Sequence, residues 1–486
     1  MSDINIIDTT LRDGHQSLWA LGMRTGVMLT ALDRLDEAGY EAMEFWVPAS
    51  HMKKMIRDLG ENTFEWLRLG TAKKRKTALR YHGGYKIPFG NIPACIEKLL
   101  VQRAIDHGIT VNRMSDPWND FPALQEEHDE LRRMGMKSVV NLIYSISPRH
   151  TDEYFMARVQ EAVKLKPYRL CFKDVGGLLT PERLTVLLPQ VLRAAGDITV
   201  EFHNHCNNGL GPYNALVAAR LGVRHIHTAV PPLADASSQP SVFNVVDNLK
   251  LLGHKIDIDM KPLREASEFL TRIAQRDGLP IGRPVAYDQS LYSQQIPGGM
   301  ISNLRFQLAK IGLGQRIDEV LEECARVRAD FGYPIMVTPL SQFVGTQAAF
   351  NIITGARYSQ VTDEVIHFAL GHIGREAIDV MDADVRDRIL DKPRAREIAK
   401  QAAPPQPTLA EVRARYGESL TDEELITRVC IDEVAVDQIR KMPTPTEEPL
   451  SGSSVVDLVA ALSRIKGRRY ISVSKGDLSL SLSTAK

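Results

Sequence analysis

The sequence has few cysteines, no long apolar run and no excess charge. Its 486 residues contain five scattered cysteines with no CxxC pair, an odd set that is typical of a reducing compartment. No run of about 18 apolar residues could span a bilayer. The N-terminal MSDINIIDTTLRDG does not resemble a signal peptide. We therefore expect a cytoplasmic protein.

Charges of opposite sign balance. Lys+Arg and Asp+Glu both number 60, so the formal net charge is zero. This gives no support for a broad nucleic-acid-binding face or a polybasic membrane anchor. The composition, 44% hydrophobic and 25% charged, is that of an ordinary globular protein long enough for a large core and more than one domain.

Eight short runs of β-forming residues recur through the first half of the chain. Most are separated by segments with apolar residues at i, i+3 and i+4, and several of these segments end in glycine, as helices often do. Eight such units predict a (β/α)8 TIM barrel over residues 1–275. A doubly wound open sheet is the alternative, but no GxGxxG follows the first run. The runs are 4–8, 40–46, 76–81, 110–116, 138–144, 169–174, 199–205 and 225–230.

The pattern changes after about residue 260, where helix-like segments follow one another with few strands between them. We expect a helical region over 276–400 and a helical extension over 401–486. AAPPQP (402–407) is typical of a linker, and 443–453 of a flexible segment. The chain ends in an expected hairpin turning near Lys475, which either docks a partner or, as we favour, closes this chain's own fold as an edge strand.

Two histidines end the seventh run. Residues i and i+2 of a strand point to the same face, so His203 and His205 can reach one ion, and imidazole suits Zn, Mn or Co. Asp13 follows the first run and could meet them, because the chemistry of such barrels lies at the C-terminal ends of the strands. The competing interpretations are hydrogen-bonded histidines and a turn or cap aspartate.

Lys173 ends the sixth run, where an unpaired ammonium is costly. Three functions compete: a Schiff-base nucleophile, a general base with a lowered pKa, and an amine carboxylated by CO2 into a metal-binding carbamate. The ordinary alternative is a lysine paired with Asp174. Arg12 is a candidate for binding a carboxylate or an enolate oxygen, with a surface ion pair as its alternative. We expect Thr180 and Pro181 to start the next helix.

Five motifs together resemble one enzyme family. They are DTTLRDGHQS, FKDVGGLLTP, HNH, SQQIPGGMISNL and VTPLSQFVGTQAAFN, spread in this order over about residues 4 to 350. They resemble the biotin-dependent carboxyltransferases: the carboxyltransferase domain of pyruvate carboxylase, the oxaloacetate decarboxylase α subunit and the transcarboxylase 5S subunit. The resemblance implies a barrel followed by a helical funnel. It also implies an enzyme that moves a carboxyl group between carboxybiotin and a 2-oxo acid such as pyruvate or oxaloacetate.

The resemblance further implies a divalent metal held by Asp13, His203, His205 and a carboxylated Lys173, where it would stabilise an enolate. Three residues would contact the oxo acid: Arg12, Gln16 and Arg80. Thr338 would relay a proton between the substrate methyl group and the biotin ring, which suits a hydroxyl because it both donates and accepts. Two residues would lie near biotin: Ser341 and Gln342.

Two loops depart from the family pattern. The family usually has Trp-Gly-Gly-Ala-Thr-(Phe/Tyr)-Asp after the second run, whereas this chain has WVPASH (46–51). After Arg80, YHGGYKIPFG replaces Gly-x-Asn-x-x-Gly-Tyr and is two residues longer. In the family both stretches lie at the substrate mouth. We therefore expect an acceptor other than pyruvate, either a larger 2-oxo acid or another enolisable carbonyl compound.

The sequence has no Ala-Met-Lys-Met block and no ATP-handling module. We expect biotin to arrive on a separate carrier protein, with a biotin carboxylase subunit as a second candidate partner, and the family suggests a homo-oligomer. One alternative function is a carbon–carbon lyase or Claisen-type synthase of related metal-dependent barrels, which share DTTLRDG and HxH. Thr338, the context of Lys173 and the PGGM block argue against it. The other alternative is a non-catalytic scaffold, against which the intact ligand set argues.

Overall fold

The computed structural model describes most of the chain. The described residues are 3–73, 76–83, 92–289, 291–294, 308, 312, 314–337, 340–400, 406–450, 459, 462, 470–475 and 478–483. Thr338, the PGGM block and residues 402–405 of the expected linker lie outside them.

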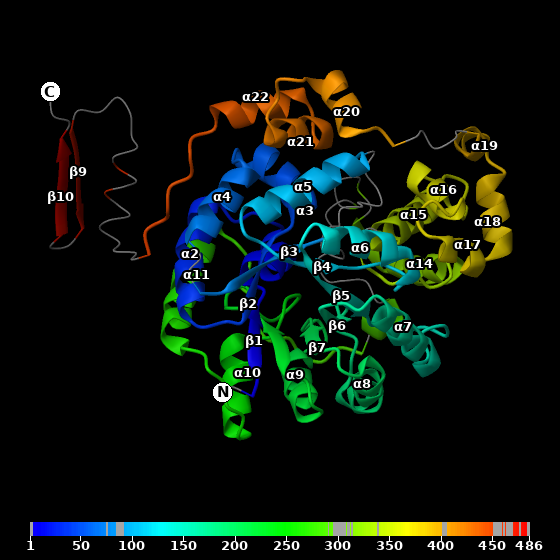
Figure 1. Ribbon diagram of the computed structural model, residues 1–486, viewed down its shortest axis with the longest axis horizontal. Coiled ribbons are helices and arrows are strands. Elements are labelled where there is room, and N and C mark those ends of the chain that lie inside the picture. The colour runs from blue at the N-terminus through cyan, green and yellow to red at the C-terminus, as the bar shows by residue number, and fades with distance from the viewer. Residues whose placement is uncertain are drawn as a thin grey trace.

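Eight parallel strands close into a barrel, which confirms the TIM-barrel prediction (Figure 1). Each strand pairs with the next in chain order, and the last pairs with the first. The strands are β1 (Asn5–Asp8), β2 (Ala42–Trp46), β3 (Ala78–His82), β4 (Val111–Met114), β5 (Lys137–Ile143), β6 (Arg169–Asp174), β7 (Val200–Asn204) and β8 (His225–Thr228).

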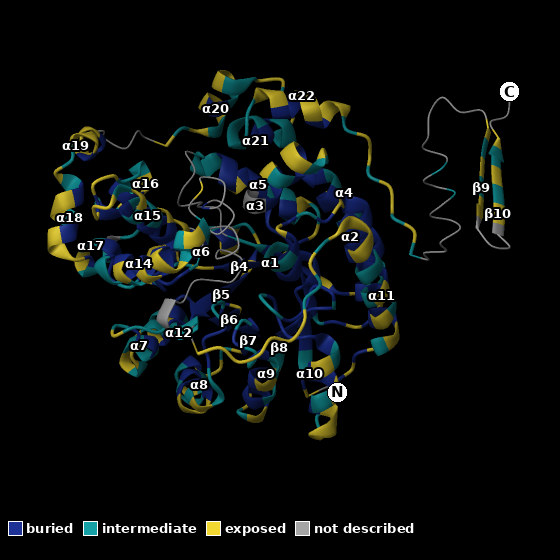
Figure 2. Ribbon diagram, turned by 180° about the vertical axis from the view of Figure 1, so that it is seen from behind, coloured by how far each residue is buried: buried dark blue, intermediate teal, exposed yellow. Residues whose placement is uncertain are grey.

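Helices surround the barrel and bury their inner faces against it, as the burial colours in Figure 2 show. One of them, α8 (Pro181–Ala195), begins as predicted: the Thr180 hydroxyl accepts a hydrogen bond from the Arg183 N–H, and Pro181 occupies the first turn. The others are α1 (His15–Trp19), α2 (Thr25–Glu37), α3 (Pro48–Lys54), α4 (Thr63–Lys73), α5 (Ala94–Asp106), α6 (Gln125–Arg133), α7 (Asp152–Lys164), α9 (Gly211–Arg220), α10 (Val242–Leu251) and α11 (Met260–Asp277).

A helical region with its own hydrophobic core follows the barrel. It packs against the loops after β4 and β5, on the side where the strands end: the ring of Trp118 lies 5.8 Å from that of Phe368, and Arg328 Nη2 donates to Ser145 Oγ at 3.0 Å. This region therefore stands beside the barrel mouth, the end formed by the C-terminal ends of the strands. Its helices are α12 (Leu291–Gln294), α14 (Ile317–Asp330), α15 (Leu340–Thr354), α16 (Asp363–Ala369), α17 (Arg375–Val380), α18 (Ala383–Leu390) and α19 (Pro393–Ala399).

The C-terminal part returns to the barrel. Three helices, α20 (Leu409–Tyr416), α21 (Asp422–Cys430) and α22 (Glu433–Lys441), lie beside α4 and α5 in Figure 1. Residues 443–450 then run along α2, where the Thr30 hydroxyl donates to the Glu448 carbonyl at 2.6 Å. The expectation of a flexible segment is therefore wrong for its described part, because backbone contacts with α2 hold it.

The terminal strands β9 (Tyr470–Lys475) and β10 (Leu478–Ser483) form an antiparallel hairpin. Within the described part of the chain they pair only with each other, and Figure 1 draws them apart from the barrel. The preferred expectation of an edge strand that closes this chain's own fold is therefore wrong: the barrel closes through β1 and β8 and leaves no edge to extend. Among the described helices, none is long and apolar enough to cross a membrane.

Candidate active site

The barrel interior is polar, although barrels of this type usually fill it with branched apolar side chains. Charged residues alternate along the strands with apolar ones, as Glu201 and His203 do around Phe202 on β7. Alternate strand residues point to the same face, so these side chains share the interior. The buried polar residues of the strands include Glu44, Arg80, Arg113, Lys173, Glu201, His203 and His227.

Asp13, His203 and His205 meet at the barrel mouth. His203 Nε2 lies 2.9 Å, and His205 Nε2 3.2 Å, from the same oxygen of Asp13, Oδ2. All three side chains are buried, and their ligand atoms lie within 4.8 Å of one another. The structure thus brings together three of the four predicted metal ligands from β7 and the segment after β1.

Hydrogen bonds fix the tautomer of each histidine. His205 Nδ1 lies 2.6 Å from the Ser237 carbonyl, which can only accept, so Nδ1 carries the proton and Nε2 is bare. The Gln239 Oε1 atom accepts from the Asn204 N–H at 3.1 Å, so the Gln239 amide nitrogen must donate to His203 Nε2, 3.1 Å away. His203 Nε2 is therefore also bare.

Two imidazole nitrogens without a proton and a carboxylate oxygen consequently lie together, and the Gln239 amide donates to the His203 nitrogen. Asp13 Oδ2 and His205 Nε2 are buried and find no hydrogen-bond partner among the described residues. Burial by itself would raise the pKa of Asp13, but the Arg12 charge holds it well below its usual range, so this carboxylate is ionised. Burial lowers the pKa of His203, so its imidazole is neutral. The separations of 2.9 and 3.2 Å are short enough for each histidine nitrogen to share one ion with Asp13 Oδ2. The donor set fits a divalent cation.

Lys173 lies beside this cluster. It is the penultimate residue of β6, where its backbone pairs in register with His203 on β7. Its amine makes no hydrogen bond or ion pair with any described residue. Asp174 instead accepts the N–H groups of Leu178 and Leu179, at 2.9 and 2.7 Å. The alternative of a lysine paired with Asp174 is therefore wrong.

The Lys173 amine is easily deprotonated. Burial, followed by the positive charges of Arg113 and Arg12, lowers its pKa from 10.5 to about 7. A large fraction is then neutral near pH 7, and the neutral amine is the form that acts as a general base or reacts with CO2.

Arg12 is buried, so its alternative as a surface ion pair is wrong. Its Nε donates to Glu44 Oε2 at 2.6 Å, and its Nη2 lies 3.3 Å from Asp13 Oδ2. Its Nη1 has no partner among the described residues. Glu44 therefore orients the guanidinium and leaves one donor beside the ligand cluster.

Arg80 does not lie free at the mouth. Its two terminal nitrogens both bind Glu201 in the barrel interior, each at 2.8 Å. This bidentate pair uses the face of the guanidinium that would grip a substrate carboxylate, so the placement argues against the predicted substrate contact.

The remaining predicted site residues that the structure describes lie on α1 and α15. Gln16 is half-buried on α1, one turn beyond Asp13. Ser341 is buried and Gln342 exposed near the start of α15. Thr338 lies outside the described residues.

Several interior residues were missed by the sequence analysis: Glu44, Arg113, Glu201, His227 and Gln239. Arg113 donates to Glu44 and, through Nη2, to Asn141 Oδ1 at 2.8 Å. All of these except Gln239 could have been found in the sequence, because they are charged or imidazole side chains within otherwise apolar strands.

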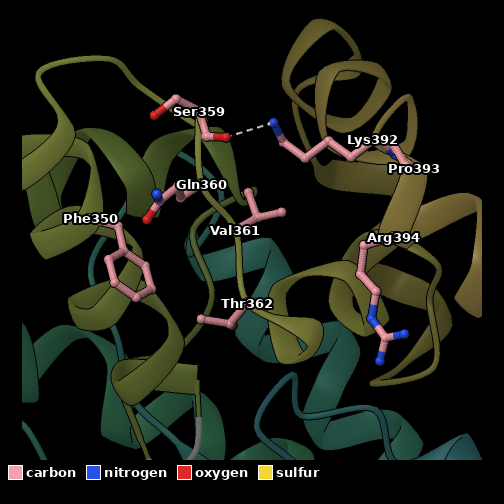
Figure 3. A pocket seen from close by; sticks show the side chains of 8 residues that line it. All are labelled: Phe350, Ser359, Gln360, Val361, Thr362, Lys392, Pro393 and Arg394. Atoms are coloured by element: carbon pink, nitrogen blue, oxygen red, sulfur yellow. Dashed lines mark hydrogen bonds between the residues drawn. The ribbon is translucent and has the colours of Figure 1, made fainter.

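The helical region holds a separate cavity of about 540 Å³ (Figure 3). Its two basic side chains are already engaged: Lys392 Nζ donates to the Ser359 carbonyl at 3.0 Å, and Arg394 Nε to Asp363 at 3.0 Å. None of the predicted site residues that the structure describes lines it. The barrel mouth is the better candidate for the chemistry.

Two family models match the chain. Residues 291–472 match a model described as a conserved carboxylase domain, and residues 125–270 match one described as HMGL-like.

Curated relatives cover most of the chain. It is 30% identical to one of the pyruvate carboxylase subunits of Methanocaldococcus jannaschii over 92% of this chain and 80% of that protein. It is 30% identical to the 2-oxoglutarate carboxylase large subunit of Hydrogenobacter thermophilus (87% and 66%) and 27% identical to the methylmalonyl-CoA carboxyltransferase 5S subunit of Propionibacterium freudenreichii subsp. shermanii (89% and 86%). The carboxyl transferase domain of Rhizobium etli pyruvate carboxylase shares the fold, with a TM-score of 0.79 at 22% identity over 90% of this chain and 76% of that domain.

Proposed function

Because this chain belongs to the biotin-dependent carboxyltransferase family, it is an enzyme that transfers a carboxyl group between biotin and a 2-oxo acid, and we propose that the transfer takes place at the barrel mouth beside Asp13, His203 and His205. The observation that carries this proposal is the convergence of two bare imidazole nitrogens and one carboxylate oxygen on a single point.

We propose that these three residues and a carboxylated Lys173 hold a divalent cation. Imidazole and carboxylate ligands suit Zn, Mn or Co. When bound, the cation supplies a Lewis acid that stabilises negative charge on an oxygen. The neutral Lys173 amine forms an N–C bond to CO2 and releases a proton to solvent. The resulting carbamate carries a negative charge that Arg12 and Arg113 favour, since their charges disfavour an ammonium at the same place.

The substrate carboxylate or enolate oxygen binds the free Nη1 of Arg12, which Glu44 holds in place. Gln16, one turn beyond Asp13, is a second contact. Thr338 relays the proton between the substrate methyl group and biotin, with Ser341 and Gln342 beside the biotin ring. These last three assignments rest on the motif VTPLSQ.

The acceptor is a 2-oxo acid larger than pyruvate. The departure WVPASH supports this, because it ends at His51 on α3. This side chain is fully buried, and neither ring nitrogen has a hydrogen-bond partner in the described part of the chain. Burial, and after it the Arg12 charge, lowers the pKa of His51 to about 3, so its imidazole is neutral. A polar group on the far side of the substrate would satisfy this imidazole.

Biotin arrives on a separate carrier protein, with a biotin carboxylase subunit as a second partner. The Methanocaldococcus jannaschii relative is named as a single subunit of pyruvate carboxylase, which supports a multi-subunit enzyme. The assembly contains more than one copy of this chain, as the family suggests. All five cysteines are free, which supports a cytoplasmic location.

The test is biotin-dependent decarboxylation of oxaloacetate and of longer 3-carboxy-2-oxo acids, with free biotin or a biotinylated carrier as acceptor. We expect stimulation by biotin, loss in Asp13→Asn, and no loss in the surface control Asp106→Asn. Absence of any stimulation by free biotin or carrier would refute the transferase site.

A further inference from the structure

A line of buried side chains runs from the ligand cluster down the barrel interior. His203 Nδ1, the ring nitrogen that faces away from Asp13, lies 3.0 Å from His227 Nδ1. The other nitrogen of His227, Nε2, lies 3.0 Å from Glu201 Oε2. All three side chains are fully buried. Three other described groups approach these atoms. Arg113 Nη1 lies 3.4 Å from His203 Nδ1 but donates to Glu44, and Glu44 Oε1 lies 3.7 Å from His227 Nδ1, beyond hydrogen-bond distance. Arg80 Nη1 also donates to Glu201 Oε2, which can accept both hydrogen bonds.

The Glu201 carboxylate at the inner end of this line determines the donor and the acceptor of every hydrogen bond in it. An ionised carboxylate only accepts, so the proton of neutral His227 must sit on Nε2 and point to Glu201. His227 Nδ1 is then a bare acceptor, and His203 must donate to it from Nδ1. A neutral imidazole has one proton, so His203 Nε2 is bare and faces the ligand cluster. The Gln239 amide requires the same tautomer independently.

Glu201 is held ionised by a pair of arginines. Arg80 binds both of its oxygens, and Arg169 Nη1 donates to Oε1 at 2.9 Å. Burial by itself would raise the pKa of Glu201, but the Arg80 charge and the His227 hydrogen bond hold it well below its usual range. This gives Arg80 a function in the interior.

Two deeper groups also have spacings that could hold a cation: Glu44, His203 and His227, and Cys171, Glu201 and His227. Both are occupied by Arg113, whose Nη1 donates to Glu44 and whose Nη2 lies 3.3 Å from Cys171 Sγ. A guanidinium excludes a second cation, so this layer supports the ligands above it.

We propose that His227, anchored by Glu201, is a positioning residue that locks His203 in the tautomer with Nδ1 protonated and Nε2 bare, and so sets the affinity of the cation site. The inference rests on the proposed metal-binding function. A metal-bound histidine is commonly oriented by an acceptor on its second nitrogen, and loss of that acceptor typically weakens metal binding about 10- to 100-fold.

The test measures Zn²⁺ affinity of the full chain by competition with a chromophoric chelator. His227→Leu removes the acceptor and should weaken Zn²⁺ binding about 10- to 100-fold. In His227→Gln, the amide oxygen can accept from His203 while the amide nitrogen donates to Glu201, so binding should stay close to that of the unmodified protein. His128→Leu, a buried histidine on α6, is the control and should leave affinity unchanged.

The outcomes separate the inference from the proposed function. If the unmodified protein binds no divalent cation, the metal site itself fails. If it binds Zn²⁺ but the leucine variant binds equally well, or the leucine and glutamine variants lose equally, the positioning function is overturned. Ring-nitrogen NMR of the unmodified, metal-free protein gives a result that does not depend on variant folding: His203, identified by loss of its signals in His203→Gln, must show a protonated Nδ1, and the opposite tautomer refutes the proposal.

Discussion

Replacing Lys173 by methionine should stabilise the metal-free protein while destroying its function. The amine is buried without a partner among the described residues, and its pKa falls from 10.5 to about 7. Methionine has a similar length and no charge to desolvate. In CO2-depleted buffer with a chelator, the amine forms no carbamate and binds no metal. The free energy of unfolding then includes the full cost of burying this amine.

The magnitude follows from the depressed pKa. Between pH 7 and 10.5 the unfolded chain binds the proton that the folded chain releases, so the stability of the unmodified protein rises with pH across that window and is lost as pH falls toward 7. One pKa unit corresponds to about 1.4 kcal/mol, so the amine costs the folded state about 4 kcal/mol at pH 7. Lys173→Met should therefore gain up to that amount at pH 7 and nothing at pH 10.5.

The assay is urea unfolding of both proteins at several pH values, with Lys164→Met on the exposed side of α7 as the control, which should show no pH-dependent gain. A stability difference that does not shrink between pH 7 and 10.5, or a variant less stable at every pH, would refute the depressed pKa. The same variant should lose its divalent metal and its carboxyl transfer, since the fourth proposed ligand is gone.

Two further results are expected. Thr338→Ala should abolish carboxyl transfer while metal content, measured by elemental analysis, stays intact; a fully active variant would exclude the proton relay. Burial raises the pKa of Asp8 to about 7, so the folded state holds a proton there, and the stability from this group is present below about pH 4 and lost as pH rises through 7. Asp8→Asn, which can still accept from Thr10, should flatten that decline in thermal melts from pH 4 to 8, and an unchanged profile would contradict it.

The barrel and the ligand cluster could be predicted because their signals are local. In each strand–helix unit the spacing of apolar residues changes from that of a strand to that of a helix, so each unit can be recognised by itself. A count of eight such units then predicts the barrel. Asp13, His203 and His205 stand at strand ends, and all strand ends of a parallel barrel meet at one rim. Their convergence therefore follows from the fold without any detail of packing.

The interior contacts could not be predicted, because they depend on which strand residues share a layer. Arg80 precedes the rewritten loop and so resembled a mouth residue, yet the pairing of β3 with its neighbours places it level with Glu201. The course of residues 443–450 could not be predicted either. It depends on hydrogen bonds to the backbone, such as that from the Thr30 hydroxyl to the Glu448 carbonyl, which do not depend on the side chain at residue 448.

The central claim is a divalent cation between Asp13, His203 and His205. Anomalous diffraction from crystals of the purified protein, recorded at the absorption edges of Zn, Mn and Co, tests it most directly. A single peak about 2 Å from Asp13 Oδ2 and from both Nε2 atoms is the predicted result. An anomalous map without a peak there, from protein that carries out biotin-dependent carboxyl transfer, would contradict it.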